Sequence, residues 1–364
     1  MLGHKRIPSR EGGIEIVVEE LATRMVEKGH NVTCYNRGGH HVSGATFDKK
    51  SVHEYKGVRI KKALTIDVKG IAAVTSSVFG AVACAFSRYD VVHFHAEGPC
   101  ILCGLPHLLG KRVIVTIHGL DHKRAKWGRF ASWYIMQGER AAVKYADEII
   151  VLSKSAQDYF MSTYGRETIL IPNGVNKPVN VNAQMIEEKW NLKKDSYILY
   201  LGRIVPEKGI HYLIDAYKQI DTDKKLVIAG GASDTSEYAD ELQKNSDKVI
   251  FTGFVEGRLL EELYSNAYLY CLPSDLEGMP LSLLEAMSYG NACLVSDIPE
   301  CTSVVSDKAM VFCHSNISDL ADKLAKACND AALVAKYKSE ASEYICNRYN
   351  WDDVTDKTLE LYVE

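Results

Sequence analysis

The sequence has no apolar run long enough to cross a bilayer, and neither sign of charge is in marked excess. Residues 68–86, VKGIAAVTSSVFGAVACAF, come nearest to a membrane span, but serine, glycine and Lys69 interrupt them. We expect an amphipathic or buried helix there. The formal net charge of -4 excludes the strongly basic character typical of nucleic-acid-binding proteins, so we expect no nucleic-acid partner.

The cysteine patterns of a disulfide framework or a zinc site are also missing. The ten cysteines are scattered, mostly among apolar neighbours. The one CxxC pair, Cys100–Cys103, has neither a second pair nor a histidine pair near it. We interpret the cysteines as reduced thiols that pack the core of a cytoplasmic protein. No spacing of ligating side chains indicates a metal, so we expect none.

What the chain does contain is a regular alternation of short apolar strands and helical stretches. This pattern predicts an α/β fold with doubly wound parallel sheets, and 364 residues are enough for two such domains. A polar segment at about residues 174–182 separates the two alternating halves. We place one Rossmann-like domain at residues 1–177 and a second at residues 178–345. A C-terminal helix at 346–364 is expected to cross back to the first domain.

The strongest local signal is LPSDLEGMPLSLLEAMSYG, an acidic loop between a strand and a helix. The free N–H groups around Gly278 to Leu281, to which Pro280 contributes none, and the helix dipole favour a phosphate or sugar hydroxyls there. Glu277 in the loop can accept hydrogen bonds from a sugar, and Glu285, about two turns further on, can reach a ribose. The alternative is that Glu277 only complements the dipole and Glu285 is a solvated helix residue.

A second signal is LGRIVPEKGIHYLI, in which Arg203 follows a strand and Lys208 precedes a helix. A guanidinium and an ammonium at a helix N-terminus form an anion site able to hold a pyrophosphate without a metal. The alternative is two surface cations, with Lys208 paired to Glu207. Because a cation at a helix start opposes the dipole, an anionic ligand is the better explanation.

A third signal is the strand-end His118 in VTIHGLDHKRAKWGRF, which is either a structural histidine or a catalytic one. The densest basic cluster of the chain follows it: Lys123, Arg124, Lys126, Trp127 and Arg129. This cluster could meet an anionic acceptor or a membrane surface, or it could be a solvated loop. His93 and His95 alternate on another strand end, and we expect one of them to line the ligand site.

Together these motifs resemble the GT-B glycosyltransferases of family 4, over almost the whole chain. Glu277 and Glu285, with seven residues between them, match the E-x7-E motif of that family. The glycine pair before a helix, the strand-end His-Gly, the sequence IPNGV, and Arg203 followed by Lys208 are further matches. HKRIPSREGG and the stretch around the basic cluster look most like bacterial polysaccharide transferases, including rhamnosyltransferase-like members.

The resemblance implies that the first domain, at residues 1–177, is the acceptor-side domain and that the second, at 178–345, binds the nucleotide sugar, with the two facing across a cleft. It also implies a retaining, metal-independent transfer of a hexose or deoxyhexose. The donor would be a nucleotide-diphosphate sugar, and the acceptor a glycan or lipid-linked oligosaccharide, with peripheral contact to the inner membrane face. No cofactor is implied. Arg203 and Lys208 would hold the diphosphate and His118 would contact the sugar near its reacting carbon. The other donor-binding residues would be Gly12, Gly13, Gly278, Met279, Pro280 and Leu281, with Glu277 on the sugar, Glu285 on the ribose, and Gly230 and Phe254 near the nucleobase.

Two other classes of function remain as alternatives. The first is another enzyme of the same fold, a nucleotide-sugar epimerase or a phosphorylase, and the second is a non-catalytic nucleotide- or glycan-binding module.

In the family, a central strand precedes the loop of Gly12 and Gly13, yet only Met1 and Leu2 are present to form it. We expect that strand to be shortened and hypothesise that the natural start lies upstream. The alternative is a true start that leaves a gap in the sheet beside the strand NVTCYNR.

Overall fold

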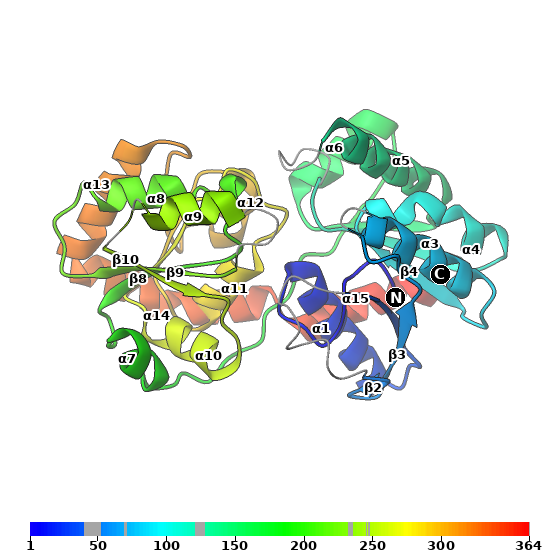
Figure 1. Cartoon of the computed structure of the whole chain (residues 1–364), viewed down its shortest axis with the longest axis horizontal. Coiled ribbons are helices and arrows are strands. Elements are labelled where there is room, and N and C mark those ends of the chain that lie inside the picture. Colours follow the sequence, from blue (N-terminus) through cyan, green and yellow to red (C-terminus); the bar gives the residue numbers. More distant parts are fainter. Residues whose placement is uncertain are drawn as a thin grey trace. The chain divides into compact units, whose positions relative to one another are not determined.

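The computed structural model describes residues 1–39, 52–68, 71–120, 128–231, 236–244, 246 and 248–363. The chain divides into two compact units (Figure 1). The first unit combines Met1–Asn173 with Trp351–Glu364, and the second is Gly174–Asn350. Each unit is an α/β domain built on parallel strands, which confirms the predicted fold class.

The elements of the first unit are α1 (Gly13–Glu27), β1 (Thr33–Arg37), β2 (Glu54–Tyr55), β3 (Val58–Ala63), α3 (Ile71–Ala85), β4 (Val91–His95), η1 (Gly98–Leu102), α4 (Gly104–Leu108), β5 (Arg112–Ile117), α5 (Arg129–Tyr145), β6 (Glu148–Val151), α6 (Lys154–Tyr164), β7 (Ile169–Leu170) and α15 (Trp351–Val363). Those of the second unit are α7 (Met185–Trp190), β8 (Tyr197–Leu201), η3 (Pro206–Lys208), α8 (Ile210–Tyr217), β9 (Lys225–Ala229), α9 (Ser236–Lys244), β10 (Val249–Gly253), α10 (Gly257–Asn266), β11 (Leu269–Leu272), α11 (Leu281–Ser288), β12 (Cys293–Ser296), α12 (Pro299–Val305), β13 (Met310–Phe312), α13 (Ile317–Asn329) and α14 (Ala331–Arg348). The described part of the chain has no helix long and apolar enough to cross a membrane.

In the first unit the strands form two groups, ordered β1-β3-β2 and β4-β5-β6-β7. Met1 and Leu2 connect these groups at the position expected for a first strand. The Met1 carbonyl accepts a hydrogen bond from the N–H of Tyr35, and Leu2 forms an isolated parallel bridge with Phe94. The strand expected there is thus present as a single bridge, and the Leu2 side chain is buried in the core.

Sequence reading missed the β2–β3 hairpin. Its turn is Lys56-Gly57, and both residues have positive φ, as a two-residue hairpin turn requires. β3 pairs in parallel with β1. Its exposed positions carry Arg59, Lys61 and Lys62, so the segment resembles a polar loop more than a strand.

The second unit has one parallel sheet, ordered β10-β9-β8-β11-β12-β13. Figure 1 shows α8, α9 and α13 on one side of this sheet and α7, α10 and α14 on the other. The four central strands, β9, β8, β11 and β12, are buried almost throughout, as expected for a parallel sheet covered on both faces.

The C-terminal helix α15 belongs to the first unit, where it packs against α1. Arg24 pairs with Asp352 at 3.0 Å, and Lys28 pairs with Asp356 at 2.6 Å. Tyr362 reaches the sheet and contacts His93 in β4. The unit is therefore assembled from both ends of the chain.

Candidate active site

The order of strands in the second unit reverses between β8 and β11. From β8 the chain continues outward to β9 and β10, whereas β11 leads to β12 and β13 on the other side. In open parallel sheets, ligands bind outside the carboxyl ends of the strands at such a switch point. The loops that follow β8 and β11 are the two loops that carry Arg203, Lys208 and Glu277.

The structure brings Lys208 and Glu277 together at this point. The Lys208 Nζ lies 2.5 Å from Glu277 Oε1, and both side chains are largely buried. The Ser274 hydroxyl donates a second hydrogen bond to the same carboxylate oxygen, at 2.7 Å. Ser296 holds Ser274 in turn, because its hydroxyl donates to the Ser274 carbonyl. Lys208 is thus paired with Glu277, across the switch point, and not with Glu207, which was the alternative left open by the sequence.

Two backbone contacts explain why these loops meet. Gly209 has φ +65°, and a Cβ there would lie 2.0 Å from the Pro273 carbonyl oxygen, so only glycine fits. The Asp275 N–H donates to the Glu207 carbonyl. Lys208 itself ends the short 3-10 turn η3, and α8 begins only after Gly209. Lys208 thus precedes the helix, and the turn places it against the β11 loop.

Arg203 and the start of α11 complete the polar surface of this region. Arg203 is half-buried directly after β8, and its guanidinium has no ion-pair partner among the described residues. Pro280 is the N-cap of α11, and its carbonyl accepts hydrogen bonds from the N–H groups of Leu283 and Leu284. The N–H groups of Leu281 and Ser282, at the first two positions of the helix, have no helical carbonyl to donate to. Met279 and Leu281 are buried, while Gly278 is half-buried.

Glu285 is not the solvated helix residue of the alternative interpretation. Its side chain is half-buried, and Oε2 accepts a hydrogen bond from the Tyr264 hydroxyl at 3.2 Å. The Tyr264 ring stacks on Tyr289 at a centroid distance of 5.3 Å. No local pattern indicated Tyr264, because it lies in α10, and strand β11 and a loop separate that helix from Glu285. The stacked tyrosines hold this carboxylate in one orientation.

The ends of the neighbouring strands β8, β9 and β10 are also closely packed. Gly230 has φ +148°, and a Cβ there would lie 1.8 Å from the Gly202 carbonyl oxygen. The Gly230 N–H donates a hydrogen bond to the Gly253 carbonyl. Phe254 comes directly after Gly253, and its side chain is 40% exposed. The two residues expected near a nucleobase thus lie on adjacent strand ends, one as bare backbone and one as an aromatic surface.

In the first unit, His118 belongs to a stack of three imidazoles. His95 Nδ1 lies 3.1 Å from His118 Nε2, and the rings of His93 and His95 stack at 4.2 Å. His93 also contacts the Thr116 hydroxyl and the Tyr362 hydroxyl, each at 2.7 Å. Burial lowers the pKa of His93 and of His95 well below the usual value, so both are neutral near pH 7.

This stack corrects one expectation. His93 and His95 are both fully buried, so neither lines an exposed site, whereas His118 is half-buried. Among the described residues, no group of three His, Cys, Asp or Glu side chains is arranged to hold a metal ion, and this holds for the three stacked histidines as well.

Gly12 and Gly13 lie at the start of α1, and Gly12 is its N-cap. The buried carboxylate of Glu15 accepts a hydrogen bond from the Lys5 N–H at 2.7 Å. A Cβ on Gly12 would lie 2.5 Å from the other oxygen of Glu15. Packing against this internal carboxylate is therefore one reason for glycine at position 12.

Most of the basic cluster lies outside the described residues: Lys123, Arg124, Lys126 and Trp127. Arg129, its last member, is exposed at the first position of α5. Two exposed aromatic side chains follow on the same helix, Phe130 and Trp133, with ring centroids 5.8 Å apart. Cationic and aromatic side chains thus lie side by side at the described edge of this cluster.

Comparison with known proteins places the chain in a family. Residues 11–177 match the family model "Glycosyltransferase Family 4", and residues 182–344 match "Glycosyl transferases group 1". The two models together span most of the chain. The chain belongs to the GT-B glycosyltransferases. The resemblance expected from the motifs is confirmed at this level.

Relatives of this glycosyltransferase are distant but extensive. An uncharacterized glycosyltransferase of Methanocaldococcus jannaschii is 25% identical, covering 98% of this chain and 95% of its own. The alpha-maltose-1-phosphate synthase of Mycolicibacterium smegmatis is 25% identical over 72% of this chain and 74% of its own. Among solved structures, Anabaena HepE in complex with UDP-glucose superposes with a TM-score of 0.80 at 16% identity. The superposition covers 99% of this chain and 97% of the HepE chain. At that identity the superposition shows the fold alone.

Proposed function

We propose that this glycosyltransferase takes its sugar from a nucleotide-diphosphate donor bound by the second unit. The pairing of Lys208 with Glu277 at the switch point carries this proposal. In this proposal the Lys208 ammonium serves the diphosphate and the Glu277 carboxylate serves the sugar hydroxyls, and the two groups lie within one hydrogen bond of each other. The UDP-glucose bound by the Anabaena protein of the same fold supports the choice of donor class.

Each polar group of the second unit then has a role in this proposal. Arg203 and Lys208 neutralise the diphosphate and stabilise it as it departs. The N–H groups at the start of α11 assist, since they attract negative charge. Glu277 orients the donor sugar, Glu285 binds the ribose, and Gly230 with Phe254 receives the nucleobase. Because two side-chain cations can supply the neutralising charge, we propose that the reaction needs no metal.

We further propose that the transfer retains the configuration of the sugar. The bond from the anomeric carbon to the diphosphate oxygen breaks, and a bond from that carbon to the acceptor oxygen forms on the same face. The proton of the acceptor hydroxyl passes to the departing phosphate oxygen. This route needs no second catalytic carboxylate, unlike a two-carboxylate hydrolase. His118 is the residue of the first unit that we assign to the reacting carbon.

The acceptor in this proposal is a glycan or a lipid-linked oligosaccharide. The exposed Arg129, Phe130 and Trp133 at the start of α5 support it, because guanidinium and aromatic surfaces suit phosphates and sugar rings. Transfer of a hexose or deoxyhexose in polysaccharide synthesis is the specific form of the activity that we propose.

A ligand-binding experiment tests the donor assignment directly. The thermal midpoint of the purified chain is measured with UDP-, GDP- and dTDP-sugars, since a ligand that binds the folded state raises it. We expect one nucleotide class to raise the midpoint, and Lys208→Ala to abolish that rise. Lys218→Ala, which removes a lysine from an exposed pair with Asp215, is the matched control.

Product analysis distinguishes the alternatives. A transferase releases the nucleoside diphosphate only when an acceptor is present, and chelation of metals leaves the rate unchanged. An epimerase changes the donor sugar without releasing the nucleotide, and a binding module does neither. Full transfer activity in both Glu277→Gln and Lys208→Ala would contradict the proposed site.

A further inference from the structure

His95 has a ring nitrogen that is buried in the first unit without a hydrogen-bond partner. Its Nδ1 lies 3.1 Å from His118 Nε2, whereas its Nε2 has no partner in the part of the chain that the structure describes. The side chain is fully buried, and nearly all buried polar atoms in proteins are hydrogen-bonded. The unpartnered nitrogen therefore restricts where the ring carries its proton.

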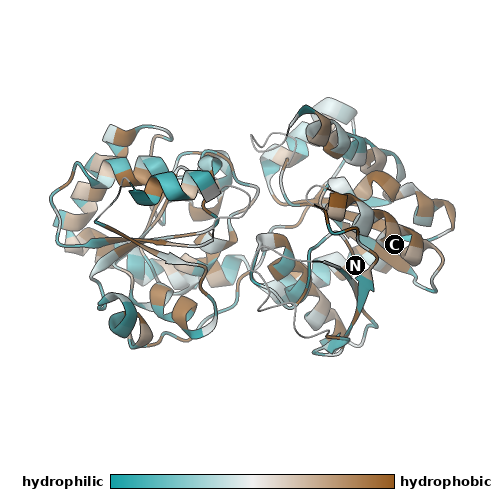
Figure 2. Ribbon diagram, viewed as in Figure 1, coloured by the Kyte–Doolittle hydropathy of each residue, from teal (hydrophilic) through white to brown (hydrophobic). Residues whose placement is uncertain are grey.

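The surroundings of His95 keep its ring neutral. Along β4, Val92 and Phe94 belong to the apolar core of the first unit, and His93 and His95 alternate with them on the opposite face. Figure 2 shows α3, which packs against this core, as a predominantly apolar ribbon. Burial lowers the pKa of His95 well below its usual value, so the ring carries one proton near pH 7.

The neighbouring imidazoles fix the orientation of the His95 ring. The ring of His93 stacks on it with centroids 4.2 Å apart and 25° between the planes. His93 is itself held by hydrogen bonds of 2.7 Å to the hydroxyls of Thr116 and Tyr362. His118 also stacks on His95, with centroids 5.3 Å apart. With both rings packed against it, His95 keeps its Nδ1 directed at His118 Nε2.

The contact between the two imidazoles allows two arrangements of the proton. In the first, His95 Nδ1–H donates to His118 Nε2, and the unpartnered Nε2 of His95 is a lone pair. In the second, His118 Nε2–H donates to His95 Nδ1, and the proton of His95 lies on its unpartnered Nε2. The second arrangement leaves a buried N–H without an acceptor, and orphaned N–H groups are rarer in protein interiors than acceptors with an unused lone pair.

The charged groups around His95 favour the first arrangement as well. The groups that act on it electrostatically are His4, His93, His118 and the amino terminus, and all of them are positive when charged. Positive charge attracts a nitrogen lone pair and repels an N–H. These groups therefore favour the proton on Nδ1, from which His95 donates to His118.

The same contact opposes a positive charge on His118. A cationic imidazole carries a proton on both nitrogens, so His118 Nε2–H would have to donate to His95 Nδ1. The proton of His95 would then move to its unpartnered Nε2. Charging His118 thus requires the unfavourable arrangement, and the neutral His118 keeps its proton on Nδ1.

We propose that His95 fixes His118 as a neutral imidazole with its proton on Nδ1. In the transfer reaction, His118 then donates a hydrogen bond from Nδ1 to an oxygen of the donor sugar, and it does not take the proton of the acceptor hydroxyl. That proton passes to the departing phosphate oxygen. This role of His118 rests on the proposed function, whereas the position of its proton does not. His95 acts through His118 and is a positioning residue.

Nuclear magnetic resonance of the full chain, with isotope-labelled histidine nitrogens, tests the position of the proton. Correlations between the ring nitrogens and the carbon-bound ring protons distinguish a protonated nitrogen from a bare one. We expect His118 to show a protonated Nδ1 and a bare Nε2 at about pH 7. Comparison with the spectrum of His118→Asn identifies its signals.

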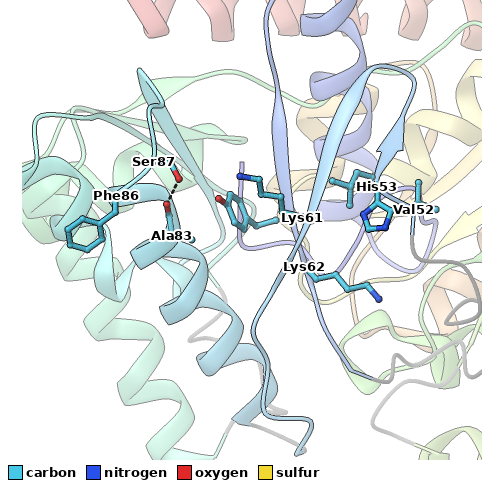
Figure 3. Close-up of a pocket in the computed structure, with 9 residues that line it drawn as sticks. Val52, His53, Lys61, Lys62, Ala83, Phe86 and Ser87 are labelled. Atoms are coloured by element: carbon cyan, nitrogen blue, oxygen red, sulfur yellow. Dashed lines mark hydrogen bonds between the residues drawn. The ribbon is translucent and has the colours of Figure 1, made fainter.

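His53 is the reference for a histidine whose tautomer is not fixed. It is exposed, and it lines an open groove of about 760 Å³ together with Lys62 and Phe86 (Figure 3). Water can serve either of its ring nitrogens, so we expect the averaged signals of two rapidly exchanging tautomers. The contrast between His53 and His118 measures the effect of the stack.

Two substitutions of His95 test its role. His95→Phe removes the donor, so the His118 signals should change to the averaged pattern. His95→Asn keeps an N–H near the place of Nδ1, so the wild-type pattern should remain. The ratio of kcat between His95→Phe and the wild type should fall about tenfold per pH unit below about pH 6.5, because the released His118 becomes protonated there. Circular dichroism at each pH confirms that the variants remain folded, and His30→Gln, which changes an exposed histidine, is the matched control.

Three results would overturn the proposal. One is a wild-type His118 with its proton on Nε2, or with protons on both nitrogens, at about pH 7. Another is a folded His95→Phe variant in which the His118 signals are those of the wild type. The last is a kcat ratio for that variant that does not change with pH. If instead His118 shows the expected tautomer and the chain transfers no sugar, the proposed function is wrong and the assignment of the proton is confirmed.

Discussion

Lys208 Nζ lies 2.5 Å from Glu277 Oε1, although 69 residues separate the two in the sequence. One residue follows β8 and the other follows β11, so the pair spans the point at which the order of strands reverses. The Ser274 hydroxyl bonds to the same carboxylate oxygen. The cation and the carboxylate therefore form one polar unit.

This pairing predicts strong coupling between the two residues. Lys208→Ala and Glu277→Gln should each lower kcat/KM for sugar transfer by about 10²- to 10³-fold. The double variant should lose little more than the worse single variant, because each substitution removes the same arrangement. Nucleoside diphosphate release under steady-state conditions measures all three. Losses that multiply would show instead that the residues act independently.

Gly209 predicts a dependence on backbone geometry. Gly209→Ala should destabilise the second unit by about 3 kcal/mol or more, since the added Cβ meets the Pro273 carbonyl oxygen and φ is positive. Gly257→Ala is the matched control, because Gly257 has φ +56° and open space around its Cβ position. It should cost only about 1 kcal/mol. Thermal midpoints compare the two, and equal shifts would contradict the close approach.

Buried histidines predict that acid destabilises the first unit. Burial lowers the pKa of His4 to about 3 and that of His93 and His95 well below the usual 6.5. The unfolded chain therefore binds protons at a higher pH than the folded one. The stability is fully present above about pH 6.5 and is lost as the pH falls below it, by up to about 1.4 kcal/mol per pH unit for each histidine.

Denaturant titrations between about pH 7.5 and pH 5 measure this loss. His4→Gln should reduce the slope by about the share of one histidine, because His4 is buried against Asn36. His30→Gln changes an exposed histidine and should leave the slope as it is. A stability that stays constant over this range would show that the buried histidines do not control it.

The contact of His95 with His118 predicts a positioning effect on activity. His95→Phe removes the nitrogen that lies 3.1 Å from His118 Nε2, whereas His95→Asn keeps a polar atom near that place. We expect His95→Phe to lower kcat by about tenfold or more with little change in KM for the donor, and His95→Asn to restore much of it. Equal kcat values in folded forms of both variants would exclude the positioning role.

Much of the fold was predictable because it depends on local patterns. Apolar strands such as KRVIVTIHG and YLYCLPS are buried on both faces, so their composition alone indicates a parallel sheet. The β2–β3 hairpin was not predictable in this way. In β3, buried residues alternate with the exposed Arg59, Lys61 and Lys62. The strand also depends on its pairing with β1, which lies more than twenty residues earlier in the chain.

The candidate site divides in the same manner. The sequence by itself determined which residue types follow the strands, including Arg203, Lys208, Glu277 and His118, because parallel strands deliver their ends to one edge. Only the tertiary structure decided which of them meet. The partner of Lys208, the tyrosine that holds Glu285 and the imidazole behind His118 all come from other elements. Such contacts depend on how strands and helices pack, and no local pattern of residues encodes that packing.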